Sequence, residues 1–362
     1  MKKRKSGVFS KVVIITIVLA VAAVGCIMGS RYMTEKKATR LEEMQAEVKA
    51  ANQQAEQDYQ ADLAAFRAEN PKGANKAWPS PKAEGWDIVD LTSYPLESPT
   101  KVTMARQDML YNGLLVVNQW HLRPQDFDES LAVKIHTYSK NAIRVSKNAV
   151  SLLPAAADAW IALMNEATVQ HGYKFFMVED GFRSYDEQAK LVEQNKSKIP
   201  AGGSDFNAGL SVHPRLYESG NAELNAKDSN FFTSEEGMWL NDNAWRYGFV
   251  FRFPLADYPT KGTLDKSYIT GINQRLRYYR YVGEASAAIM YHTGMCLEEY
   301  IDYLGAHNHV AVFEDGILRY EILREYVDGD DMVTVTQSSK PGVQAVHCLL
   351  DNMGYVVVIL EY

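Results

Sequence analysis

The spacing of apolar residues changes several times along the chain, and each spacing predicts a different element. Between Lys11 and Arg31 lies an uncharged run, residues 12–30. As a helix this run would be about 28 Å long. A hydrocarbon core of about 30 Å requires a similar length. The pattern therefore predicts a membrane-spanning signal anchor, and the alternative is a signal peptide that is cleaved or lipidated.

A second apolar pattern occupies residues 35–69, which contain neither Gly nor Pro. From Leu41 to Phe66 the apolar positions recur every three or four residues, the spacing of one helix face. We expect a helical stalk over 31–70, either a single solvated helix or a weak dimerising coiled coil. Three prolines follow within 71–86, and this composition predicts a linker over 71–100.

Beyond residue 100, short apolar runs alternate with helical patterns. The sequence predicts short strands over 114–118 and 175–182 and helices over 152–172 and 184–196. Helices and strands without a regular βαβ order favour the α+β class. From residue 308 the chain becomes β-rich, with a turn at Asp315-Gly316. We expect a domain over 101–307 and a β-rich segment over 308–362, which is either an added sheet or a separate module.

Charge is distributed unevenly between the two sides of the predicted anchor. The chain carries a net charge of −7, yet residues 1–30 hold five basic side chains and no acid, which leaves −12 for the rest. Basic residues before a membrane span favour a cytoplasmic N-terminus, here the head 1–11, and an extracytoplasmic body. The acidic body argues against a nucleic-acid partner, because such proteins present basic surfaces.

Three cysteines are too few for a disulfide scaffold or a four-cysteine zinc module. Cys296 and Cys348 both follow the predicted anchor, where a disulfide is chemically permitted. Cys296 also lies in an apolar helical run, which suits a buried thiol. Both interpretations of this pair stay open at the level of sequence.

Three segments together resemble one enzyme family. They are GFRSYDEQ (181–188), WLNDNAWRYGFVFRFP (239–254) and YRYVG (279–283), and the resemblance extends over about 108–304. In order and spacing they are similar to VanY-like D-alanyl-D-alanine carboxypeptidases of the lysostaphin/D-Ala-D-Ala-peptidase/Hedgehog superfamily. The resemblance implies a small antiparallel sheet flanked by helices, a catalytic zinc, and removal of the terminal D-alanine from peptidoglycan stem peptides.

The family supplies its zinc ligands through S-x-H-x-x-G-x-A-x-D and a later E-P-W-H, whose glutamate is the base. An alignment that starts at Ser211 retains His213 as a ligand and puts Gly220 at the aspartate position. Counting back from YRYVG puts Arg275 at the base position and Tyr278 at the last histidine. Glycine has no ligand atom, and arginine cannot act as a base because its pKa exceeds about 12.

The resemblance therefore predicts a degenerate zinc site and a chain without an intact catalytic group. Zinc remains a cofactor only if the site is rearranged, with Glu218, Glu223 or Asp228 joining His213. In that alternative the chain is an active zinc D-alanyl-D-alanine carboxypeptidase that trims peptidoglycan.

The family's substrate-binding strip R-S-x-x-x-Q matches Arg183, Ser184 and Gln188. Together with Ser211 and Arg275, these residues are the candidate peptide-binding set, because arginine pairs well with a carboxylate. We expect a membrane-anchored, non-catalytic protein of the cell envelope that binds peptidoglycan stem peptide or an envelope protein. A dimer through the stalk and an interaction role for the stalk and the β-rich segment are further possibilities.

Overall fold

The structure, a computed structural model, describes residues 85–217, 231–272, 276–327 and 331–362. The predicted basic head, anchor and stalk lie outside the described residues. Within the described ranges, no helix combines the length and the apolar character that a membrane crossing requires. The strands and helices run in this order: β1 Trp86–Asp90, β2 Pro99–Ala105, β3 Val133–Lys134, α2 Ile135–Tyr138, β4 Ser151–Leu152, α3 Pro154–His171, β5 Phe176–Asp180, α4 Tyr185–Glu193, β6 Ser211–Leu216, α6 Glu235–Asn243, β7 Phe249–Phe251, α7 Ser267–Thr270, β8 Tyr279–Tyr281, α8 Glu284–Thr293, α9 Leu297–Ala306, β9 His309–Glu314, β10 Ile317–Tyr326, β11 Met332–Ser338, β12 Ala345–Leu350 and β13 Tyr355–Glu361.

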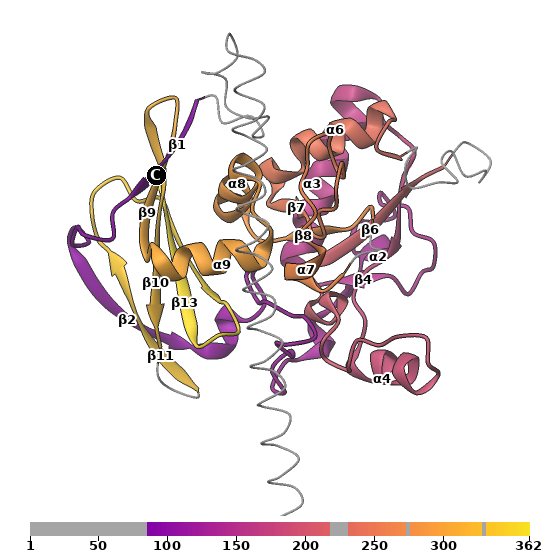
Figure 1. The fold of residues 1–362 in the computed structure, drawn as a ribbon, viewed down its shortest axis with the longest axis horizontal. Coiled ribbons are helices and arrows are strands. Elements are labelled where there is room, and N and C mark those ends of the chain that lie inside the picture. The colour runs from indigo at the N-terminus through magenta and orange to yellow at the C-terminus, as the bar shows by residue number, and fades with distance from the viewer. Residues whose placement is uncertain (1–84, 218–230, 273–275, 328–330) are drawn as a thin grey trace, which may run out of the picture. The chain divides into compact units, whose positions relative to one another are not determined.

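The strands between residues 176 and 281 form a four-stranded antiparallel sheet in the order β5-β6-β8-β7 (Figure 1). Helix α3 packs on this sheet through Trp160, whose ring meets Phe249 edge to face. The helix starts with Pro154 and ends at Gly172, whose φ of 74° is a conformation that glycine adopts more easily than residues with a side chain. The helices expected over 152–172 and 184–196 and the strand over 175–182 are thus confirmed with shorter bounds.

A second antiparallel sheet has the order β1-β9-β10-β13-β12, and its strands β10 and β13 contribute residues to two apolar cores. The side chains of β13 alternate between the two cores: Val356 and Val358 belong to the first core, whereas Val357 and Ile359 belong to the second. The second core is shared with helices α8 and α9, and the first includes Val333 of the β2–β11 ribbon. The α+β class with antiparallel sheets is therefore confirmed.

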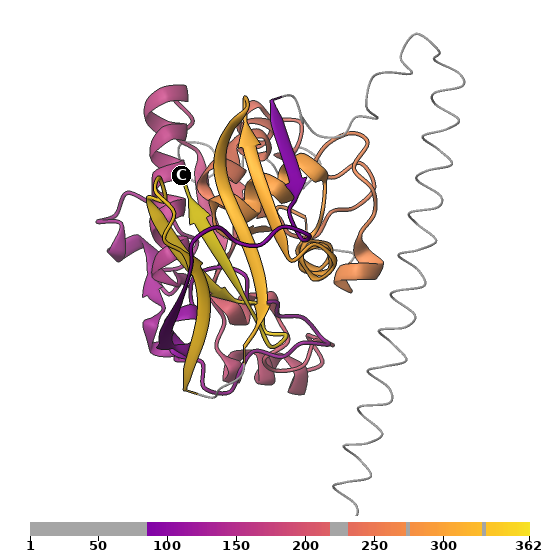
Figure 2. The ribbon, with the colours of Figure 1, turned by 90° about the vertical axis from the view of Figure 1, so that its left-hand side faces the viewer.

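Residues 71–84 of the predicted linker lie outside the described residues, and the described part, residues 85–100, differs from that prediction. Residues 86–90 form β1, which pairs with β9 from Trp86↔Glu314 to Asp90↔Val310. Figure 2 shows the indigo strand β1 beside the orange strands of the C-terminal part. Strand β2 likewise pairs with β11. The β-rich segment is therefore a sheet added to the domain, completed by strands from before residue 106, and it shares both cores with the rest of the fold.

Residues 114–118 were predicted as a strand, and this prediction is wrong. Leu114 to Val117 are fully buried, but their backbone bonds to loops and side chains instead of a neighbouring strand. The Leu115 carbonyl accepts a hydrogen bond from Arg280, and the Val116 carbonyl accepts one from Asn352. An apolar run of this length shows burial, but burial alone does not identify its backbone partners.

Candidate functional site

The rings of His213 and Tyr278, two of the metal-ligand positions implied by the resemblance, lie together with the ring of Phe206 at one end of the four-stranded sheet. Tyr278 precedes β8, His213 is in β6, and Phe206 belongs to the 3₁₀ helix Asp205–Ala208. The ring of Tyr278 lies 4.7 Å from that of Phe206 and 6.3 Å from that of His213, between centroids. We call Phe206, His213 and Tyr278 the ring set. Phe253 packs on the Tyr278 ring at 4.9 Å and extends this aromatic stack.

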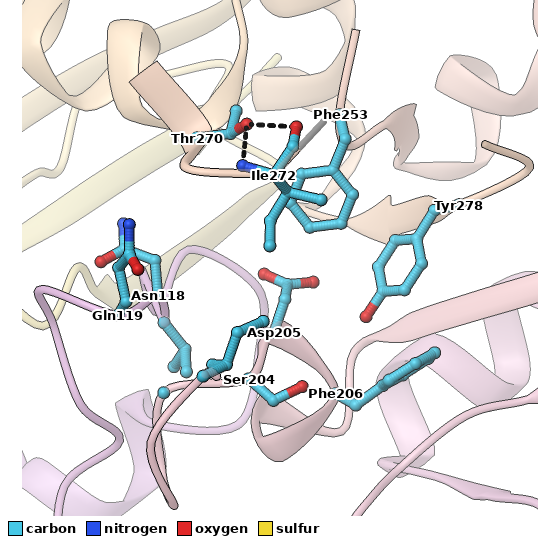
Figure 3. A pocket seen from close by; sticks show the side chains of 12 residues that line it. Asn118, Gln119, Ser204, Asp205, Phe206, Phe253, Thr270, Ile272 and Tyr278 are labelled. Atoms are coloured by element: carbon cyan, nitrogen blue, oxygen red, sulfur yellow. Dashed lines mark hydrogen bonds between the residues drawn. The ribbon is translucent and has the colours of Figure 1, made fainter. Parts of the chain in front are cut away.

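A small cavity opens beside the ring set. Asp205, Phe253 and Tyr278 border it, together with Asn118 from a loop and Thr270 at the end of α7 (Figure 3). Its volume of about 20 Å³ holds one or two water molecules and not a dipeptide.

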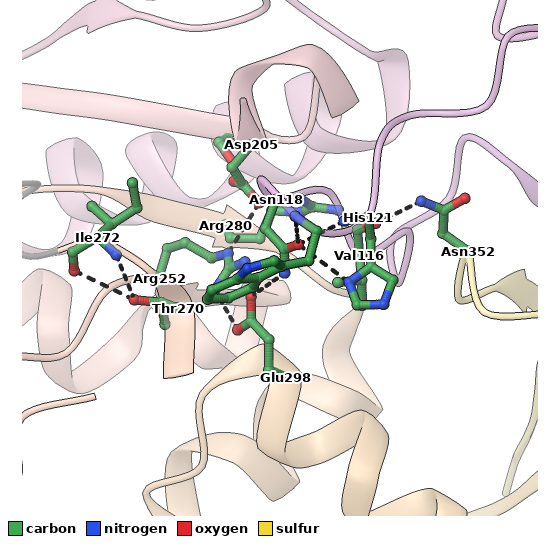
Figure 4. Close-up of polar contacts among 12 residues, drawn as sticks. Val116, Asn118, His121, Asp205, Arg252, Thr270, Ile272, Arg280, Glu298 and Asn352 are labelled. Carbon is green, nitrogen blue, oxygen red and sulfur yellow. Dashed lines mark hydrogen bonds and ion pairs between the residues drawn. The ribbon is translucent and has the colours of Figure 1, made fainter. Parts of the chain in front are cut away.

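A buried ionic network is centred on Asp205, the residue immediately before Phe206 of the ring set. Figure 4 shows Asp205 together with Arg252, Arg280 and Glu298. Asp205 accepts hydrogen bonds from Arg252 at 3.0 Å and from Arg280 at 2.7 Å, and Ser211 donates to its other oxygen. Arg252 also forms a two-pronged contact with Glu298 of α9, at 2.6 and 2.8 Å. Two cations and two anions thus compensate each other away from water, as buried charges require.

The network also sets the charge state of its members. Burial opposes ionisation of Asp205, but the neighbouring guanidinium groups of Arg280 and Arg252 outweigh it and lower the pKa of this carboxyl. Burial likewise opposes ionisation of Glu298, and Arg252 overcomes it, so the pKa of Glu298 is also lowered. Both acids are therefore charged at neutral pH. Ser211 is fully buried, donates its hydrogen bond to Asp205 and does not line the cavity.

The predicted peptide-binding strip has divided roles in the structure. Arg183 donates to Gln188 at 2.9 Å and to Asp180 at 3.0 Å, and its guanidinium covers the Phe206 ring at 4.9 Å. Gln188 is fully buried, so in this structure it positions Arg183 and is inaccessible to a ligand. Ser184 forms a capping box with Glu187 at the start of α4. Only Arg183 of the strip is thus directed toward the ring set.

On the other side of His213, basic side chains surround a single carboxylate. Glu179 lies at an irregularity in the β5–β6 pairing, a place where strands often redirect a side chain. Its oxygens lie 3.7 Å from His213, 3.3 Å from Arg215 and 3.7 Å from Arg277. Within the described ranges, the buried Oε2 of Glu179 has no hydrogen-bond partner. The other oxygen, Oε1, accepts a hydrogen bond from Arg215 at 3.3 Å.

The described residues do not fit a catalytic zinc ion. Zinc in such sites takes three nitrogen, oxygen or sulfur ligands from the protein. Among the residues that the structure describes, no group of three or more His, Cys, Asp and Glu side chains is arranged to hold a metal. Tyr278 is almost fully buried and packs between Phe206 and Phe253. Arg275, Gly220 and the alternative ligands Glu218, Glu223 and Asp228 lie outside the described residues.

The structure decides between the two interpretations of Cys296 and Cys348. Cys296 and Cys348 are both free and buried, so the buried-thiol interpretation is the correct one. Burial raises the pKa of each thiol, and neither is therefore a reactive nucleophile at neutral pH.

Asp205 and Glu179 are the important site residues that the sequence analysis missed. Asp205 stands in the run SDFNAG, where nothing marks it as buried, and its partners follow 47 and 75 residues later. The one available signal is the pair of arginines Arg252 and Arg280 inside apolar strand sequences, FRF and YRY, which require buried counter-ions.

The fold is that of a domain of the D-Ala-D-Ala-peptidase type. Residues 149–284 match the VanY family model, described as D-alanyl-D-alanine carboxypeptidase. A D-alanyl-D-alanine carboxypeptidase of Enterococcus faecium is 28% identical over 230 residues, which covers 62% of this chain and 69% of the relative. One from Enterococcus faecalis is 26% identical over 233 residues, covering 62% and 78%.

Among solved structures, the vancomycin-resistance D,D-dipeptidase VanXYg, in complex with a D-Ala-D-Ala phosphinate analogue, has the same fold. Its TM-score is 0.53 at 20% identity, and the match covers 73% of this chain and 99% of that one. This chain is thus related to the VanY-like D-alanyl-D-alanine carboxypeptidases, and the resemblance noted from its motifs is confirmed.

Proposed function

We propose that this chain is a membrane-anchored, extracytoplasmic and non-catalytic VanY-like protein that binds the carboxylate end of peptidoglycan stem peptides. The relatives named D-alanyl-D-alanine carboxypeptidases support the peptide class. The uncharged run 12–30 and the basic head support the anchor and its orientation. The mismatch between zinc chemistry and the described ring set supports the loss of hydrolysis.

The observation that carries the proposal is the fixed guanidinium of Arg183. Asp180 and Gln188 hold it through separate nitrogens, and the Phe206 ring supports one of its faces. A side chain held in this way loses little conformational freedom when it binds a ligand. A charge-assisted hydrogen bond to a carboxylate contributes about 1.5–3 kcal/mol, which corresponds to roughly 10- to 100-fold in affinity.

The basic cluster around Glu179 adds a second attraction for an anion. Arg215, Arg277 and His213 all lie within 3.7 Å of that carboxylate, so this edge of β6 already accommodates one negative group. A peptide carboxylate that approaches Arg183 would experience the same positive field. The cavity beside Tyr278 is too small for the peptide, which would therefore lie across the ring set and not inside the cavity.

The test is calorimetric titration of the full chain with a stem-peptide analogue that ends in D-Ala-D-Ala. We expect saturable binding at millimolar peptide or below, and about 10-fold or greater weakening in Arg183→Gln, because one charge-assisted contact is lost. The matched control is Arg319→Gln, since Arg319 is also ion-paired, to Glu314 at 2.9 Å, but lies in β10. It should bind as the wild type does.

Two further measurements separate the alternatives. A peptide whose C-terminus is amidated should bind much more weakly, and equal binding of the two peptides would refute recognition of the carboxylate. Release of D-alanine that a chelator abolishes would instead establish the active zinc carboxypeptidase. An absence of binding up to millimolar peptide would refute the proposed function.

A further inference from the structure

The ligand pattern S-x-H-x-x-G-x-A-x-D can be placed on this chain in a second register, seven residues earlier than the one that starts at Ser211. Starting at Ser204, its histidine position is Phe206 and its aspartate position is His213. The pattern's glycine is then Gly209, and its small residue is Ser211. In the register that starts at Ser211, those two positions are Leu216 and Glu218, which are neither glycine nor small.

The backbone at Gly209 supports the earlier register. Gly209 has φ +69°, a conformation that side chains rarely adopt, and it ends the 3₁₀ helix Asp205–Ala208. A Cβ added there would come within 2.9 Å of the Leu153 side chain. The position therefore requires glycine for two independent reasons. Ser211, at the small-residue position, is fully buried and fits beside Asp205.

The packing of the rings supports the same register. Val212 pairs with Tyr279 across β6 and β8, so continuation of this antiparallel pairing places His213 opposite Tyr278. Phe206 reaches the Tyr278 ring from the preceding 3₁₀ helix, at 4.7 Å. The earlier register thus brings all three ligand positions to one place. The later one requires residue 220, beyond the end of β6 at Leu216.

We infer that the ring set is the former metal position of this domain, with Phe206 at the first ligand position, His213 at the second and Tyr278 at the third. Phenylalanine has no ligand atom, and neutral tyrosine is a poor substitute for imidazole. The Phe206–Tyr278 contact therefore fills with apolar surface the space that a metal would need. This inference rests on the resemblance and the geometry, and peptide binding by the cleft could fail without affecting it.

The inference predicts which substitutions restore metal binding. In the full chain, Phe206→His/Tyr278→His would join the native His213 to give three imidazoles, a complete protein ligand set for zinc. We expect one equivalent of bound zinc after dialysis and an affinity about 100-fold or more above that of the wild type. Cobalt substitution, followed by its visible absorption, gives a readout that needs no enzymatic activity.

Two controls distinguish the registers. Gly220→Asp/Tyr278→His completes the ligand set of the register that starts at Ser211 and should leave the affinity for zinc near that of the wild type. Phe253→His/Tyr278→His places two histidines in the same aromatic stack, in which Phe253 and Tyr278 are 4.9 Å apart, but outside the pattern. It should also bind zinc weakly.

Tight binding by the Gly220→Asp variant, or wild-type affinity in a folded Phe206→His/Tyr278→His protein, would overturn the inference. Circular dichroism establishes folding of each variant. If the double variant does not fold, the single substitution Phe206→His is tested instead, because it places one new imidazole beside that of His213. It should bind cobalt about 10-fold more tightly than the wild type, and no gain in that folded variant would also count against the inference.

Discussion

Substitution of Asp205 tests whether the buried ionic network stabilises the fold beneath the ring set. Asp205→Asn keeps the size of the side chain and removes its charge. Arg252 would retain its two contacts with Glu298. Arg280 would retain only backbone acceptors, which include the Gly113 and Leu115 carbonyls. The variant therefore leaves a fully buried guanidinium without a carboxylate.

The magnitude follows from these contacts. Removing one partner of a buried ion pair costs about 3–5 kcal/mol. The Asn carbonyl can still accept a hydrogen bond, which offsets about 1 kcal/mol. We therefore expect the free energy of unfolding to fall by about 2–4 kcal/mol out of a total of about 5–15 kcal/mol. For a domain of this size, the melting temperature should fall by about 5–10 °C.

The assay is urea unfolding of the full chain, followed by tryptophan fluorescence, with thermal melts as a second measure. The matched control is Asp87→Asn, because Asp87 is an exposed carboxylate of β1. Its unfolding free energy should stay within about 0.5 kcal/mol of the wild type. Combining Asp205→Asn with Arg280→Met should give a coupling energy of about 1 kcal/mol or more. A loss below about 1 kcal/mol for Asp205→Asn, or a coupling near zero, would refute the reasoning.

The remaining predictions concern other buried groups. The hydrogen bond from His309 to Glu321, at 2.7 Å, raises the pKa of His309, so its stabilising contribution is complete below about pH 6.5 and is lost as the pH rises through the raised value. The difference in melting temperature between wild type and His309→Gln should therefore shrink from about pH 6 to about pH 9, and a constant difference would contradict this assignment. Cys296 and Cys348 should not react with a thiol reagent in the native protein, and all three cysteines of the chain should react after unfolding without reductant; a count of one would show a disulfide.

Local signals predicted the helices well, because each carries its own start and stop. Helix α3 begins with Pro154 and ends at Gly172, and α4 has its capping box at Ser184. Strand β1 has no such signal, since its burial depends on pairing with β9, more than two hundred residues later. Proline-rich composition nearby favoured a linker. Whether residues 86–90 form a strand is therefore determined by the partner strand β9 and not by the segment itself.

The candidate site shows the same division between local and distant information. His213 follows a serine by two residues, so it attracted the start of the ligand pattern, while Phe206 offers no chemical reason to be considered. Gly209 and Ser211 fit the pattern in the sequence itself, but the structural support for this register comes from the left-handed backbone at Gly209 and from the contact of Phe206 with Tyr278. Neither is visible in a single sequence, because glycine occurs for many reasons and ring contacts join distant segments.

The ionic network explains how this scaffold positions the ring set with side chains alone. Arg280 of β8 lies two residues after Tyr278 and binds Asp205, which immediately precedes Phe206. This contact therefore ties together the two backbone segments whose rings meet. On its other side, Arg280 holds the loop at Gly113 and Leu115. The ion pair of Arg280 with Asp205 and the ring contact of Tyr278 with Phe206 thus join the same two segments, the 3₁₀ helix Asp205–Ala208 and the start of β8.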